Sequence, residues 1–345
     1  MASKSKTLGK VSHAGRDWRS LVPGAAAALL YLALAVYLYG PYMRLRFSAG
    51  AAYGMHSVAG AVGCFVLSRR WISSFGGSLF AGALYGFCPF MLSFAAYHPA
   101  AGLPAALLPW MFCPAIYYRA RQAKTGAQAA VSVLLAVLPF MAVAAFFRLS
   151  AQAGAFFMPV QVRNGWQHAV GLAIPLWEPV RFSLSVYHVA LPAFGLGMMM
   201  YVIVRRMSVL ITVAVAVLLS LAGPVFAVPP IFWLAVPMLY AAVLTGLGLQ
   251  GLAWAGAADR RWIFGCTMIV GAMAILMLVL NAYGKGGPVL RVTGLSYSLA
   301  AVMTGCIFFL TRAKLRWNLF RWILLCGGIA VDILFSARIL VDRFF

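Results

Sequence analysis

The sequence predicts an all-α, polytopic transmembrane protein, a helical bundle of about eleven spans of the length that a bilayer requires. Composition is the first reason for this prediction. Hydrophobic residues make up 64% of the 345 residues and charged residues only 9%, against about 25% charge in soluble domains. The mean hydropathy is accordingly +0.94. The second reason is that the apolar residues are gathered in runs of about 20, the number that an α-helix needs to cross the hydrocarbon core.

The runs follow one another along the chain with polar turns between them. The predicted spans are 21-40, 50-68, 74-95, 101-118, 126-147, 183-204, 208-227, 229-251, 262-281, 290-311 and 317-337. Pro224, Pro229 and Pro230 fit either an outer turn between the seventh and eighth spans or one broken helix. The first run has no small-x-small cleavage site after it, so we expect it to be retained. The predicted organisation is a basic tail, 1-20, and a single membrane domain, 21-345.

The positions of the basic residues predict the orientation. With the N-terminus inside, the six predicted inner segments hold 18 of the 27 lysines and arginines, as at the Arg69-Arg70 turn. This bias follows the positive-inside rule and predicts an inner (plasma) membrane protein with a cytoplasmic N-terminus and an outer C-terminus. The net charge of +22 is then explained by orientation and by anionic head groups, so we expect a membrane partner and no nucleic acid.

One outer connection, 148-182, is much longer than the others. It mixes polar and charged residues with Phe156, Phe157, Trp166 and Trp177. Aromatic side chains anchor a segment at the boundary between water and lipid, and long structured loops often carry function. We therefore predict a lid or re-entrant segment over an outward cavity.

Glu178 in this connection is the candidate catalytic base, together with His98 at an earlier outer turn. A carboxylate beside a membrane cavity is suited to taking a hydroxyl proton, whereas an ion pair with Arg181 would give Glu178 a purely structural role. His98 can contact a phosphate or a sugar hydroxyl, or simply hydrogen-bond a neighbouring carbonyl. The residues leave both alternatives open.

The predicted outer side carries more arginine than topology requires. Arginine forks bind phosphate oxygens in pairs, which indicates a phosphate-bearing lipid, and ordinary head-group contact is the alternative. The candidate substrate-binding residues are Arg44, Arg46, Arg163, His168 and Arg181. Asp332 lies within the last span, where we expect it to pair with an arginine or face the bundle interior.

The histidines and cysteines do not follow metal-binding spacings. No HxxxH, HxxE or CxxC pattern occurs, and all six cysteines lie in apolar runs, where we interpret them as small buried hydrophobic residues. We expect no metal and no cofactor.

Several segments, taken in order, resemble the YfhO-type bacterial membrane proteins of the type C glycosyltransferase superfamily. They are the Arg69-Arg70 hairpin, AGALYGFCPF at 81-90 with the following histidine, LPAALLPW at 103-110, YHVALPAFGLGMMMYVIVRR at 187-206, LLSLAGPVF at 218-226 and VPMLYAAVLTGLGLQGL at 236-252. The resemblance covers about residues 55-260.

This resemblance implies a type C glycosyltransferase-like bundle that takes a sugar from a polyprenyl-phosphate carrier for envelope glycan or glycolipid modification. The superfamily normally has an acid in the first outer loop, but the loop from Gly40 to Ser57 contains none. That catalytic position therefore has no counterpart here. Either Glu178 substitutes for it, or the chain is a non-catalytic membrane subunit or a transporter of phosphate-bearing lipids.

Overall fold

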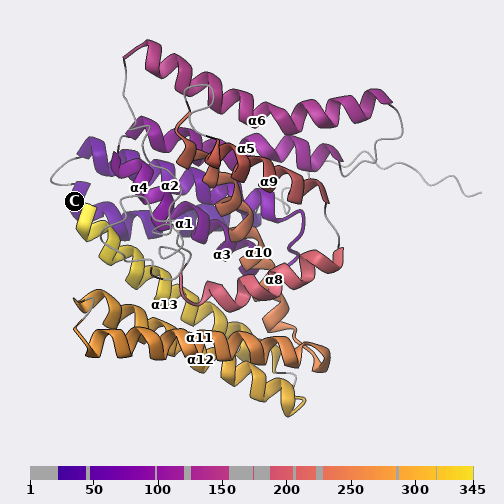
Figure 1. Ribbon diagram of the computed structural model, residues 1–345, viewed down its shortest axis with the longest axis vertical. Helices are drawn as coiled ribbons and strands as arrows, with labels where there is room; N and C mark the ends of the chain where they lie inside the picture. The colour runs from indigo at the N-terminus through magenta and orange to yellow at the C-terminus, as the bar shows by residue number, and fades with distance from the viewer. Residues whose placement is uncertain are drawn as a thin grey trace, which may run out of the picture.

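The computed structural model of this protein is built from helices (Figure 1). It describes residues 22–43, 47–97, 99–119, 126–154, 174, 187–204, 207–222, 228–284, 287–315 and 317–344, and these residues contain no β-strand. The helices are α1 (Val22–Met43), α2 (Phe47–Ser68), α3 (Phe75–Gly86), α4 (Pro89–Tyr97), α5 (Pro99–Arg119), α6 (Gly126–Gln152), α8 (Ala190–Val204), α9 (Met207–Leu221), α10 (Ala235–Ala253), α11 (Arg260–Ala282), α12 (Gly287–Arg312) and α13 (Asn318–Phe344), with the short 3-10 helices η2 (Pro230–Leu234) and η3 (Ala257–Asp259).

The predicted all-α polytopic bundle is confirmed. In the part of the chain that the structure describes, nine helical segments are long and apolar enough to cross a membrane. The short apolar helices α8 and α9 correspond to two further predicted spans. Helices α3 and α4 together form one of the nine segments, Phe75–Ser93, with the break between them at Phe87 and Cys88.

The α10 segment lies at the centre of the bundle. In its most apolar stretch 78% of the residues are buried, the same share as in Phe75–Ser93, against 22% in α6. Figure 1 agrees with this, since α6 lies at one end of the long axis, the α11 and α12 pair lies at the other, and α10 runs between them.

Glycines bring the backbones of α8 and α10 together. A Cβ added at Gly197 would overlap the carbonyl of Leu244, and one added at Gly248 would overlap the carbonyl of Ala193. Small residues are typical of membrane helix interfaces, because lipid supplies no hydrophobic driving force and close backbone packing replaces it. The glycines therefore determine how closely α8 and α10 approach.

Polar side chains join the predicted inner turn between α2 and α3 to the end of α10. The Gln250 amide oxygen accepts from the Ser74 backbone N–H at 2.9 Å and from the Ser73 hydroxyl at 3.2 Å. Ser74 is in turn the N-cap of α3, since its hydroxyl accepts from the Gly77 N–H. These bonds hold the turn that carries Arg70 in a fixed place.

Tyrosine hydroxyls connect other helices through backbone carbonyls. Tyr31 of α1 donates to the Leu79 carbonyl at 2.7 Å, and Tyr85 of α3 donates to the Ala105 carbonyl at 2.6 Å. A hydroxyl in a bilayer interior needs such a partner, so each bond also selects one relative placement of its two helices.

Candidate functional site

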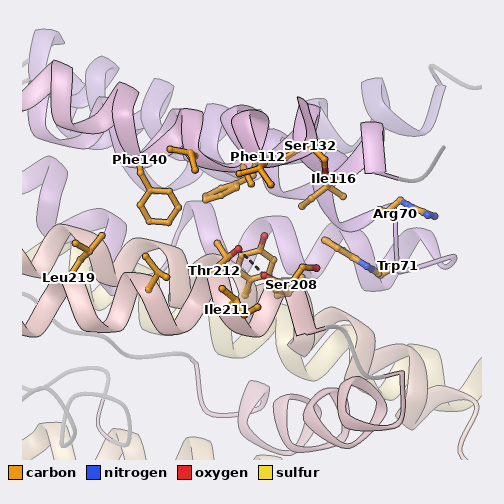
Figure 2. A pocket seen from close by; sticks show the side chains of 17 residues that line it. Arg70, Trp71, Phe112, Ile116, Ser132, Phe140, Ser208, Ile211, Thr212 and Leu219 are labelled. Carbon is orange, nitrogen blue, oxygen red and sulfur yellow. Dashed lines mark hydrogen bonds between the residues drawn. The ribbon is translucent and has the colours of Figure 1, made fainter. Parts of the chain in front are cut away.

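A groove of about 820 Å³ lies between α6 and α9, with α5 and α10 forming its floor. Its lining residues are Arg70, Trp71, Phe112, Ala115, Ile116, Ser132, Val133, Ala136, Val137, Phe140, Ser208, Val209, Ile211, Thr212, Val215, Leu219 and Tyr240. Figure 2 shows Arg70 and Trp71 at one end of this groove and Phe140 and Leu219 at the other.

The end formed by Arg70 is polar. Arg70 is partly buried and follows the end of α2, where its backbone N–H bonds the Leu67 carbonyl at 3.3 Å. Ser132 and Ser208 contribute hydroxyls to the lining. Trp71 beside Arg70 is an arrangement typical of the membrane–water interface, where an amphipathic ring and a cation lie at head-group level.

Aromatic rings form the apolar floor. The Phe112 ring meets the Phe140 ring edge-on at 6.0 Å between centroids and the Tyr240 ring at 6.2 Å, and Trp71 meets Tyr240 at 6.4 Å. Rings in mutual contact lose little further freedom when a ligand binds, so this floor is preformed. The groove's rim is open, since Val133 is 64% exposed.

The length of the groove matches one leaflet of a bilayer. From Ser208 to Leu219 the lining follows α9 for about 16 Å at 1.5 Å per residue, about half of the hydrocarbon thickness. An occupant with an anionic group at Arg70 and a long apolar chain along the floor would be complementary to it. The residues that line the groove include no carboxylate, histidine or cysteine, so this arrangement is suited to binding and not to acid–base chemistry.

The seven residues predicted from sequence to form a site lie outside the described residues. They are Glu178, His98, Arg44, Arg46, Arg163, His168 and Arg181. Their clustering, and the outward cavity over which 148-182 was expected to lie, stay predictions.

Sequence reasoning did not identify the groove. Arg70 was interpreted as a marker of orientation and as part of the hairpin that carries the resemblance, and Ser132 and Thr212 were part of ordinary apolar runs. The neighbouring pair Arg70-Trp71 was the available signal, because it places a cation and an interfacial ring at one helix end. The apolar lining had no local signal, since any membrane helix carries such residues on all faces.

Asp332 faces the bundle interior, as predicted, and its partner is a histidine. Its carboxylate lies 2.9 Å from Nδ1 of His188, and both side chains are buried. The partner is a histidine and not an arginine because the turn before α8 brings His188 against α13, which sequence spacing does not reveal.

The cysteines occupy more varied positions than predicted. Cys64, Cys88 and Cys266 are buried, Cys113 and Cys326 are partly buried, and Cys306 is exposed. An exposed position on a membrane helix remains apolar, because it faces lipid. Among the described residues no group of three or more histidine, cysteine, aspartate or glutamate side chains could hold a metal ion.

Comparison with known proteins identifies no relative, so the groove between α6 and α9 is the main guide to function. No protein-family model matches the chain, and no curated protein or solved structure matches it either.

Proposed function

We propose that this chain is a multi-pass membrane protein that binds a long-chain lipid with an anionic head group in the groove between α6 and α9. The observation that carries the proposal is the groove's polarity along its length, with Arg70 at one end and only apolar and aromatic side chains at the other. A guanidinium binds phosphate oxygens through paired, charge-assisted hydrogen bonds, which makes a phosphate head group the best match.

The same lipid class agrees with the resemblance to YfhO-type proteins, because a polyprenyl-phosphate-linked sugar is also a long apolar chain with a phosphate. On this proposal the protein belongs to the bacterial inner membrane with its N-terminus in the cytoplasm. The groove's polar end then lies on the cytoplasmic side, since Arg69 and Arg70 follow the positive-inside rule. This side favours the lipid-binding or lipid-transport alternative for the groove over sugar transfer at the outer leaflet.

The glycosyltransferase activity, with Glu178 as base, remains a separate proposal that rests on the resemblance. It predicts that Glu178→Gln abolishes transfer from a polyprenyl-phosphate-linked sugar in reconstituted membranes. Full transfer by this variant would remove the catalytic role from Glu178.

Lipid binding at the groove is tested by native mass spectrometry. The purified protein is placed in nanodiscs that contain polyprenyl phosphate or phosphatidylglycerol, and the lipid that stays bound to it is measured. Arg70→Gln is expected to weaken retention of the phosphate-bearing lipid by about ten- to a hundredfold, because one charge-assisted contact contributes about 1.5–3 kcal/mol. Arg69→Gln is the matched control, since exposed Arg69 bonds the Ser73 carbonyl and is not part of the lining.

A second pair of variants tests the apolar part. Ala136→Trp fills the groove and is expected to reduce retention of either lipid, whereas Ala130→Trp on the exposed surface of the same helix is expected to leave it unchanged. Equal retention by Ala136→Trp and Ala130→Trp would refute binding at this groove. Selective retention of the polyprenyl phosphate would favour the carrier lipid over ordinary phospholipid.

A further inference from the structure

The carboxylate of Asp332 holds the chain just before α8 by two hydrogen bonds. Oδ1 lies 2.9 Å from Nδ1 of His188, and Oδ2 accepts from the backbone N–H of Val189 at 3.0 Å. The hydroxyl of Ser336, one turn along α13, lies 3.4 Å from Oδ1. Both carboxylate oxygens are therefore occupied, within a span of the membrane domain.

These contacts lie deep in the bundle. The hydroxyl of Tyr187, the residue before His188, donates to the carbonyl of Phe87. Phe87 is at the break between α3 and α4, inside the span Phe75–Ser93. The chain therefore begins α8 at the level of a helix break within the membrane domain and not at a water-exposed end.

The pairing determines which imidazole nitrogen carries hydrogen. An ionised carboxylate only accepts hydrogen bonds, so beside an ionised Asp332 the Nδ1 of His188 would be the N–H donor and Nε2 would hold a lone pair. The Tyr297 ring meets the imidazole edge-on, 4.7 Å between centroids at 80°, and restricts its rotation. The orientation of Nε2 is thus fixed from two sides.

Nε2 is fully buried and has no hydrogen-bond partner among the described residues. His188 itself is 0% exposed. Buried polar atoms in proteins nearly always have a partner, so an orphaned acceptor requires an explanation. A hydrogen bound at Nε2 would also find no acceptor among the described residues, so the favourable change on binding a proton would be the cation that it places beside the carboxylate of Asp332.

Among the described residues, the titratable groups near His188 are neutral apart from Asp332, so a proton bound there would balance the charge of this carboxylate. Tyr187 and Tyr297 lie near Asp332, and Tyr187 lies near Tyr39 and Cys88 as well. Phenols and thiols are ordinarily neutral at neutral pH. Farther along α13, Arg338 pairs with Asp342, the other carboxylate described on this helix.

We propose that His188 and Asp332 form a proton-binding site inside the membrane domain. One proton from the aqueous phase binds to the lone pair of Nε2, which converts neutral imidazole beside carboxylate into an imidazolium–carboxylate pair with no net charge. Ionisable groups within membrane spans commonly serve as proton sites. Because the same carboxylate holds Val189, the bound proton changes how firmly the start of α8 is attached to α13.

The test is nitrogen NMR of ¹⁵N-histidine-labelled protein in nanodiscs over a range of pH. The chain contains five histidines, and the His188 signals are assigned by their loss in His188→Gln. At high pH His188 is expected to carry hydrogen on Nδ1 alone, and lower pH is expected to add hydrogen at Nε2. A signal that stays unchanged wherever the protein is folded, or a hydrogen on Nε2 alone, would overturn the proposal.

Asp332→Asn tests whether the pair is the unit that binds the proton. The amide keeps the shape and can still accept from Nδ1 but carries no charge, so the doubly protonated fraction of His188 is expected to fall about tenfold or more at low pH. Asp342→Asn is the control and is expected to leave the His188 signals unchanged. Equal protonation in Asp332→Asn and the wild type would overturn the proposal, whereas failure of lipid binding in Arg70→Gln would not affect it.

Discussion

At the scale of residues, the two aspartates described on α13 illustrate how burial changes what a carboxylate contributes. Asp332 is 3% exposed and bonds His188 and Val189, whereas the Asp342 side chain is 44% exposed and pairs with Arg338. Removing one partner of a buried pair leaves the other group unsatisfied in a low dielectric, but an exposed pair is replaced by water. The two positions therefore predict different costs for the same substitution.

We expect Asp332→Ala to lower the free energy of unfolding by about 3–5 kcal/mol, because Nδ1 of His188 and the Val189 N–H lose their acceptor. Asp342→Ala on the same helix is expected to cost about 0–1 kcal/mol. Unfolding titrations in mixed micelles measure both. Equal losses in the two variants would contradict the structural importance of the buried pair.

At the scale of elements, α10 organises the bundle through its small residues. Gly248 and Gly246 lie on it where α8 and α3 approach, and an added Cβ would overlap the backbone of Ala193 or Gly77. By contrast, a Cβ at Gly271 of α11 would meet no atom within 4 Å. Packing therefore requires glycine at these two positions of α10, whereas an alanine at position 271 of α11 would place its methyl group in open space.

Gly248→Ala is therefore expected to destabilise the protein by about 1–3 kcal/mol, since α8 and α10 must move apart. Gly271→Ala is the matched control and is expected to have no effect or to stabilise α11 by up to about 1 kcal/mol. Thermal unfolding of the purified variants in one detergent compares them. If Gly248→Ala were as stable as Gly271→Ala, the close contact between α8 and α10 would be wrong.

At the scale of the whole molecule, each helix that crosses the membrane places the turns at its two ends on opposite sides. On the topology predicted from sequence, eleven crossings that start from an inner N-terminus would place the turn after α11 outside and the turn after α12 inside. Tyr283 in the first of these turns is 75% exposed, and Ala313 in the second is exposed as well. Both positions lie just beyond the ends of apolar spans, Ala257–Ala282 and Pro288–Arg312, where we expect a reagent in water to reach them.

We expect Tyr283→Cys to react with a membrane-impermeant thiol reagent on intact cells and Ala313→Cys to react only after the membrane is opened. The measurement uses a background in which the six native cysteines are replaced. Reaction of Ala313→Cys on intact cells would reverse the orientation, and it would then place the Arg70 end of the groove outside.

The sequence by itself determined the class of the protein and the positions of its helices. Each predicted span has a counterpart in the structure, including the span near Pro224, where α9 ends at Leu221 and η2 begins at Pro230. This succeeds because bilayer thickness imposes a length on every apolar run, and that requirement is local. The resemblance and the residues grouped around Glu178 concern parts of the chain or activities that the described structure does not test.

Only the tertiary structure decided which surfaces meet. The groove arises where α6 and α9 stand apart over an aromatic floor, and the buried pair arises because the turn before α8 reaches Asp332 on α13. Helices that are apolar on every side carry little information about their neighbours, because hydropathy does not distinguish a lipid-facing side chain from a helix-facing one. The sequence therefore determined the spans and predicted their direction, and close packing determined where Arg70, His188 and Asp332 were brought into sites.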